Sequence, residues 1–245
     1  EYATGSYNTF VGSQAGQGGT TSAPYSSGLY NTAMGYQALQ DFTTGTYNVA
    51  LGSLALQTHT TGNRNVAIGY AAMNNTDAGS TSLDSSDNVF IGYGAGSGAW
   101  TNTSCQYNLG IGSLVMDAAL DGALYNIGMG YEALGALTSG DSNVAVGHGA
   151  GASLTTGGTN ILIGRAAGDA HTSLEGAVLI GHFAGSAIND NNSNYSVMIG
   201  YNAGISVTSG LANNLIGHYA GRYLSTNGYN TMYGYEVGQY MNGSS

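Results

Sequence analysis

The sequence predicts an all-β protein: a parallel β-solenoid, or β-roll, of about 13 coils that occupies residues 1–245 as a single repeat domain. Three observations predict this fold. The motif Asn-x-x-apolar-Gly-x-x-Ala recurs thirteen times, with a few substitutions at its Asn and Ala. Successive motif glycines are never fewer than 17 residues apart, and seven of the twelve intervals equal 17. A fixed minimum with occasional additions indicates a closed coil of constant size with insertions.

Each coil is predicted to contain short strands and no helix. Apolar and β-branched residues precede the motif glycine, and a second glycine turn precedes the asparagine, as in Thr43-Thr44-Gly45. Seventeen residues are too few for a βαβ crossover, so equivalent strands of successive coils must stack in parallel. At about 4.8 Å between neighbouring strands, twelve coil steps predict a rod of roughly 58 Å.

The motif asparagines and glycines are predicted to be architectural. Glycine suits a turn in which a Cβ would be strained, and an asparagine amide can bond to the backbone in a turn. Equivalent asparagines can also form a ladder along the stack. The residues assigned to these roles are Asn48, Asn65, Asn143, Asn160, Gly52, Gly69, Gly147 and Gly164.

The strands show apolar residues on both faces. With the motif glycine as position 0, positions −3 and −1 are mostly Val and Ile and are predicted to point into the core. Position −2 then faces outward, yet it is apolar or glycine in all thirteen copies. Such a strip predicts burial between copies of the chain, with a homotrimer preferred and a twofold pairing as the alternative. The expected interface residues are Ala50, Ala67, Phe90, Leu162, Leu179, Met198 and Leu215.

The composition excludes several classes of function. Asp and Glu number 13 against 3 Lys and Arg, which gives a net charge of −10. Without a basic patch, binding to nucleic acid or to anionic membrane surfaces is disfavoured. No apolar run reaches the roughly 18 residues of a membrane-spanning helix, so no membrane insertion is expected in this chain. The Gly-x-Gly strings belong to the repeat, and no catalytic constellation stands out, so we expect neither enzyme activity nor a cofactor.

The longer intervals place insertions at one corner of the coil, in residues 17–30, 74–87, 97–107 and 186–195. Loops that leave a repeat stack often form its binding surface. Trp100 and Tyr25 lie in two of these insertions. Both are therefore candidate receptor contacts.

Aromatic residues recur at two further positions. Position +1 is Tyr or His in nine copies, and position −5 is Tyr in seven. Equivalent positions stack, so both form ladders, which either stabilise the assembly or offer a platform for sugar rings. The candidate binding residues at position +1 are Tyr36, Tyr70, Tyr93, Tyr131, Tyr201 and Tyr235.

No metal site is expected. His148 and His182 are two coils apart, roughly 10 Å along the stack, which is too far to share one ion within a chain. Asp84, Asp87 and Asp190 offer oxygen ligands for Ca²⁺ but match no defined loop motif. Solvated acidic loops are the preferred interpretation, and calcium binding is left open.

The segment Asn-Val-Ala-Ile-Gly at 65–69, with Ala72 three residues later, resembles the head repeat of trimeric autotransporter adhesins of the YadA type. Similar arrays occur in bacteriophage tail fibres, and tyrosine-rich copies such as Thr46-Tyr47-Asn48 are more similar to those. The resemblance extends from about residue 5 to 238. It implies a left-handed roll wound as a trimer and a role in attachment.

These observations lead to two functional hypotheses. The first is a structural or adhesive fibre, such as a phage tail fibre or trimeric adhesin, that projects from a virion or cell surface and contacts a glycan or protein receptor. The alternative is a self-assembling extracellular filament or shaft that has no specific receptor.

Overall fold

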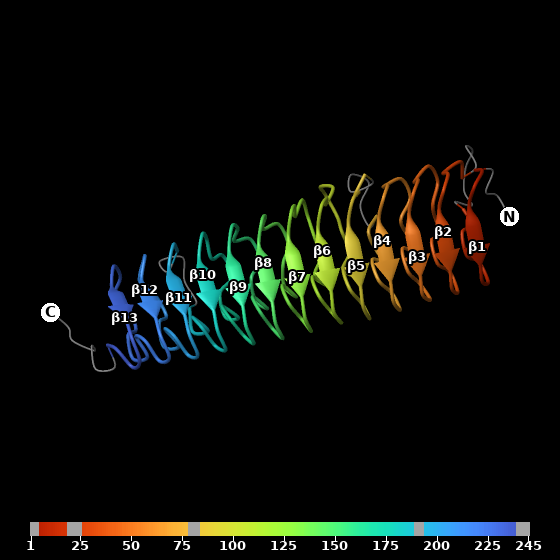
Figure 1. Ribbon diagram of the computed structural model, residues 1–245. Coiled ribbons are helices and arrows are strands. Elements are labelled where there is room, and N and C mark those ends of the chain that lie inside the picture. The colour runs from red at the N-terminus through yellow and green to blue at the C-terminus, as the bar shows by residue number, and fades with distance from the viewer. Residues whose placement is uncertain (1–4, 19–25, 78–83, 189–193, 239–245) are drawn as a thin grey trace. The chain divides into compact units, whose positions relative to one another are not determined.

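The computed structural model describes residues 5–18, 26–77, 84–188 and 194–238. These residues contain thirteen β-strands and no helix, and the first six strands and the last seven strands each pair in parallel in chain order as a β-solenoid (Figure 1). The all-β class and the parallel solenoid predicted from the sequence are confirmed. The left hand of the roll and its trimeric state stay predictions.

The chain divides into two compact units, Glu1–Asn126 and Ile127–Ser245, called unit 1 and unit 2 below. The expectation of a single domain over 1–245 stays a prediction. The strands of unit 1 are β1 (Thr9–Val11), β2 (Thr32–Met34), β3 (Val49–Leu51), β4 (Val66–Ile68), β5 (Val89–Ile91) and β6 (Leu109–Ile111). Those of unit 2 are β7 (Ile127–Met129), β8 (Val144–Val146), β9 (Ile161–Ile163), β10 (Val178–Ile180), β11 (Val197–Ile199), β12 (Asn214–Ile216) and β13 (Thr231–Tyr233).

The strands are the three residues before each motif glycine, and equivalent residues pair in register. In unit 2, Leu162 of β9 lies opposite Leu179 of β10. In unit 1, Ala67 of β4 lies opposite Phe90 of β5 even though the interval between these coils is 23 residues. Insertions therefore leave the strand register unchanged.

The remainder of each coil turns through residues with positive φ. In the third coil, φ is 60° at Tyr47, 135° at Gly52, 63° at Leu54 and 50° at Leu56. Hydrogen bonds between coils continue through these turns, since the Leu54 N–H donates to the Tyr36 carbonyl at 2.9 Å. Neighbouring coils thus hold non-glycine residues in a conformation that they adopt rarely.

The side chains of the strands point the opposite way from the sequence-based prediction. In β4, Ala67 at position −2 is fully buried, whereas Val66 and Ile68 at −3 and −1 are half-buried on the outside. The expected inter-chain interface is therefore wrong at position −2, because its residues lie inside a single chain. The fully buried residues are Ala50, Ala67, Phe90, Leu162, Leu179, Met198 and Leu215.

The narrow interior of the coil explains this orientation. Position −2 shares the interior with the motif alanine at +3, such as Ala72, and with position +7, such as Leu154. A large residue at −2 needs glycine beside it: a Cβ on Gly96 or Gly110 would overlap the Phe90 ring. Small residues, and large residues that have a glycine beside them, fill this space at the packing density of a protein core. The β-branched residues occupy the outer face, where a pleated surface suits them.

Candidate functional site

A buried amide ladder runs along the coils at position −4. In unit 1, the Asn65 N–H donates to Oδ1 of Asn48 at 2.9 Å. In unit 2, the Asn160 N–H donates to Oδ1 of Asn143 at 3.2 Å, and the Ala177 N–H donates to Oδ1 of Asn160 at 2.9 Å. All four asparagines are fully buried. The ladder satisfies buried backbone groups, which is the architectural role assigned to these residues.

The motif glycines are required by both conformation and space. At Gly52, Gly69, Gly147 and Gly164, φ lies between 130° and 138°. A Cβ at Gly147 would lie 2.5 Å from the carbonyl oxygen of Gly164 in the next coil. These glycines therefore let the backbones of successive coils approach each other at this corner.

The side chains at −3 and −1 form a continuous outer sheet face in each unit. In unit 2, Ile161 and Ile163 of β9 are 39% and 37% exposed. No charged residue occupies either column in the thirteen strands described. The face of unit 2 consists of Ile127, Val144, Ile161, Val178, Val197, Asn214 and Thr231 at −3, and of Met129, Val146, Ile163, Ile180, Ile199, Ile216 and Tyr233 at −1. A single chain thus leaves two apolar columns in water.

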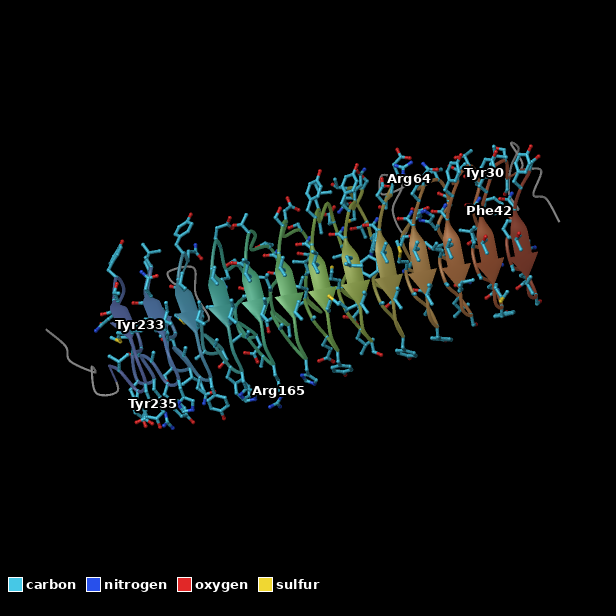
Figure 2. The ribbon with its side chains drawn as sticks, in the orientation of Figure 1. Tyr30, Phe42, Arg64, Arg165, Tyr233 and Tyr235 are labelled. Carbon is cyan, nitrogen blue, oxygen red and sulfur yellow. The ribbon has the colours of Figure 1, made fainter. Side chains whose placement is uncertain are left out.

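The aromatic residues at −5 and +1 stack ring on ring. At −5 in unit 1, the centroid of Tyr30 is 4.9 Å from that of Tyr7 and 5.0 Å from that of Tyr47. At +1, Tyr70 and Tyr93 stack at 5.5 Å with planes 12° apart. Figure 2 shows that Tyr30 and Arg64, both at −5, project from the same edge of unit 1. Both predicted ladders therefore form stacked columns where aromatic residues occupy neighbouring coils.

Stacking changes what the ladder tyrosines offer to a ligand. Tyr201 is covered on both faces, by His182 at 5.1 Å and by His218 at 5.2 Å. A ring in such a column presents its edge and hydroxyl group, so the face-on platform for sugars is not available there. Tyr70, Tyr93, Tyr131 and Tyr235 each stack on at least one neighbour, and Tyr36 lies between coils that carry Ser13 and Ser53.

Trp100 is a core residue. Its side chain is fully buried, and its ring packs edge-on against Phe90 with centroids 5.9 Å apart. The insertion 97–107 folds against the coil, since the Trp100 N–H donates to the Asn75 carbonyl at 3.1 Å. The expectation that Trp100 contacts a receptor is wrong, because burying its large apolar ring stabilises the coil. Tyr25, the other loop aromatic, lies outside the described residues.

One of the acidic insertion residues, Asp87, forms an ion pair. Arg64 bonds to Asp87 in bidentate fashion, with Nε–Oδ1 at 2.6 Å and Nη2–Oδ2 at 2.7 Å. The hydrogen bond from Arg64 lowers the pKa of Asp87. Asp190 lies outside the described residues. Within the residues described, no three His, Cys, Asp or Glu side chains are grouped to hold a metal ion.

A buried polar cluster surrounds His59 in unit 1. His59 is fully buried, its Nε2 lies 3.1 Å from Nδ2 of Asn65, and its Nδ1 lies 2.9 Å from Oγ1 of Thr76. Because an amide nitrogen only donates, Nε2 accepts, and the ring is neutral with its proton on Nδ1. Burial lowers the pKa of His59 and raises that of Asp77. The Thr60 hydroxyl donates to Oδ2 of Asp77 at 2.6 Å.

Two features were missed by the sequence analysis. His59 occupies position +7, where other coils carry Phe42 or Leu154, so a polar residue in an apolar column was the available signal. Arg165 shares the +1 column with His148 and His182. The sequence analysis did not assign Arg165 to the ladder, although the repeat spacing places it at position +1.

Comparison with protein-family models, with curated proteins and with solved structures finds no match to this chain. In the described part of the chain, no helix has the length and apolar character needed to cross a membrane. Function is therefore inferred from the geometry described above.

Proposed function

We propose that this chain is a structural segment of a self-associating fibre, located on a virion or cell surface, that mediates attachment. The single observation that carries the proposal is the uncharged outer sheet face. Soluble monomers rarely expose contiguous apolar patches beyond a few hundred Å². In unit 2, five consecutive strands, β7 to β11, carry Val or Ile at −3 and Val, Ile or Met at −1. Association of copies would remove these columns from water.

A second copy of the chain is the favoured occupant of this face. A net charge of −10 with no lysine opposes docking on an anionic lipid surface or a nucleic acid. Two pleated sheets can interdigitate their side chains at about 10 Å separation, and identical faces match in length and spacing. We keep the homotrimer as the preferred assembly, with a twofold pairing as the alternative.

The receptor-free filament is supported by one specific observation. Trp100, the strongest candidate for a receptor contact, lies in the core, and the insertion that carries it folds inward. If the remaining insertions also lack a receptor site, the solenoid acts as a shaft. The attachment fibre and the receptor-free filament both require self-association of the chain. They differ in whether the surface binds a ligand.

Light scattering tests the shared step. We expect the wild-type chain to have the mass of an oligomer, and the double variant Ile163→Glu/Ile180→Glu to dissociate, because two carboxylates would be buried without partners. The matched control, Thr156→Glu/Thr172→Glu, adds the same charge at exposed positions of the same coils and should keep the oligomeric mass. A wild-type monomer at micromolar concentration, or equal masses for both variants, would overturn the proposal.

A further inference from the structure

The +1 corner of unit 2 differs chemically from the same corner of unit 1. In unit 2 all seven residues are aromatic or cationic, and together we call them the corner ladder: Tyr131, His148, Arg165, His182, Tyr201, His218 and Tyr235. The equivalent residues of unit 1 are Ser13, Tyr36, Ser53, Tyr70, Tyr93 and Ser113. The corner ladder therefore holds three of the five histidines and one of the three basic residues of an acidic chain.

The corner ladder is a column with a regular step. Stacked centroids are 5.2 Å apart for Tyr131 and His148, 5.1 Å for His182 and Tyr201, and 5.1 Å for His218 and Tyr235. Figure 2 shows Arg165 and Tyr235 on the same edge of unit 2. Side chains held in this way are preorganised, so a ligand would not have to order them.

The corner ladder presents mainly hydrogen-bond donors. Arginine has no acceptor, so Nη1 of Arg165 donates to Nε2 of His182 at 3.2 Å. The guanidinium lies 5.3 Å from the Phe183 ring centroid, and Arg165 as a whole remains exposed. Tyrosine hydroxyls and the remaining guanidinium N–H groups of Arg165 thus lie along the edge, whereas Nε2 of His182 accepts from Arg165 and the Nδ1 atoms of His182 and His218 are buried.

A second cation adjoins the same corner. The Arg222 guanidinium lies 4.3 Å from the centroid of Tyr219, whose ring is edge-on to His218 at 4.3 Å. Two carboxylates adjoin the corner ladder: the Tyr235 hydroxyl donates to Glu236, which raises the pKa of Tyr235, and Asp169 lies within the field of Arg165. The cation of the ladder itself is Arg165, which lies between His148 and His182 in the column.

We propose that the corner ladder binds a linear carboxylated polysaccharide that runs along the stacking direction. This inference rests on the proposed attachment function and names the chemical class of its receptor. Arginine recognises a planar carboxylate through paired N–H groups, and the exposed tyrosine hydroxyls can bond to the hydroxyl and ring oxygens of a sugar chain. An elongated column with a regular step suits a ligand that is itself extended and periodic.

Spacing disfavours the other linear ligands. An extended peptide places side chains of one face about 6.6 Å apart, which loses register with steps of 5.1–5.2 Å within a few coils. Duplex DNA carries a phosphate about every 3.4 Å along each strand, which does not match the 5.1–5.2 Å steps of the corner ladder either.

Biolayer interferometry of the full chain on immobilised polygalacturonate tests the inference, with neutral dextran as the reference surface. We expect binding to polygalacturonate that weakens with added NaCl, and none to dextran. The triple variant His148→Tyr/Arg165→Tyr/His182→Tyr preserves stacking and should lose at least tenfold in affinity. The matched variant Tyr70→Ser/Tyr93→Ser changes the ladder of unit 1 and should bind as the wild type does. Arg165→Gln provides a milder single change if the triple variant unfolds.

Absence of wild-type binding, or equal binding by the wild type and the variants of the corner ladder, would overturn the inference. Light scattering on the same samples separates this outcome from a failure of the proposed assembly. An oligomer that does not bind polygalacturonate contradicts the ligand assignment alone. A monomer that binds it contradicts the assembly alone.

Discussion

At the scale of single residues, the coil depends on positions where the backbone conformation and the neighbouring coil accept only glycine. Gly147 has a φ of 138°, and the next coil leaves no room for a Cβ. Gly149, two residues later, has a φ of 65°, and a Cβ added there would meet nothing within 4 Å. Ala166, its equivalent in the next coil, adopts a φ of 53°. Identical changes at these two glycines should therefore have very different costs.

We predict that Gly147→Ala lowers the free energy of unfolding by about 4 kcal/mol or more, because backbone overlap adds to the conformational strain. Gly149→Ala should cost only about 1 kcal/mol, the penalty of a left-handed conformation without a clash. Urea denaturation followed by circular dichroism compares the two. Similar urea midpoints for the two variants would contradict the close approach of successive coils at the motif glycine.

At the scale of the element, a coil combines a tight interior with an apolar outer strand face. The repeat, the strand positions, the turn glycines and the amide ladder could all be predicted, because each leaves a periodic trace in the sequence. The direction of the strand side chains could not be predicted by polarity, since Val66, Ala67 and Ile68 are all apolar. Residue size was the usable signal: the interior is narrow and accepts alanine, while the outer face does not restrict volume.

The candidate site was less predictable than the fold. The recurrence of tyrosine at +1 and −5 indicated ladders, but the ring orientation, which closes the faces of Tyr201, follows from the close spacing of the coils, with ring centroids 5.1 Å and 5.2 Å apart. The position of Trp100 depends on Phe90 and on the glycines around it, which lie in different coils. Contacts of this kind leave no periodic trace along the chain.

The buried His59 makes one coil of unit 1 sensitive to acid. Its pKa is lowered by burial from the ordinary value of 6.5, so below that pH the unfolded chain binds a proton that the folded chain does not. Stability is therefore complete above about pH 6.5 and falls as the pH decreases toward the folded pKa. Asp77 acts with the opposite sign, because its raised pKa favours proton uptake by the folded state.

We predict that His59→Leu reduces this loss of stability at acidic pH. Leucine occupies the equivalent position of another coil, as Leu154. Between about pH 7.5 and about pH 5, the free energy of unfolding of the wild type should fall by up to about 2 kcal/mol more than that of the variant, at about 1.4 kcal/mol per pH unit. Urea unfolding at both pH values measures the difference. His148→Gln, at an exposed histidine, serves as the control and should follow the wild type. Equal pH dependence in the wild type and His59→Leu would contradict the buried neutral imidazole.

At the scale of the whole molecule, we assign assembly to the apolar outer sheet face and recognition to a polar corner. The −2 residues belong to the core of one chain, so the strands offer their −3 and −1 columns for contact between copies. Assembly through these columns leaves the corner ladder of unit 2 at the edge of the sheet, where a ligand can reach it. Assembly and recognition are then carried by different side chains and can be altered separately.

Thiol labelling at two adjacent residues of β8 tests the central claim most directly. Ala145→Cys places a thiol in the core, and Val146→Cys places one on the outer sheet face, with small changes in volume. We predict that the Ala145→Cys thiol is protected from a soluble disulfide reagent in the assembled protein and in the Ile163→Glu/Ile180→Glu background. The Val146→Cys thiol should be protected in the assembly and react in that background. Equal reactivity of the Val146→Cys thiol in both states would contradict self-association through the outer sheet face.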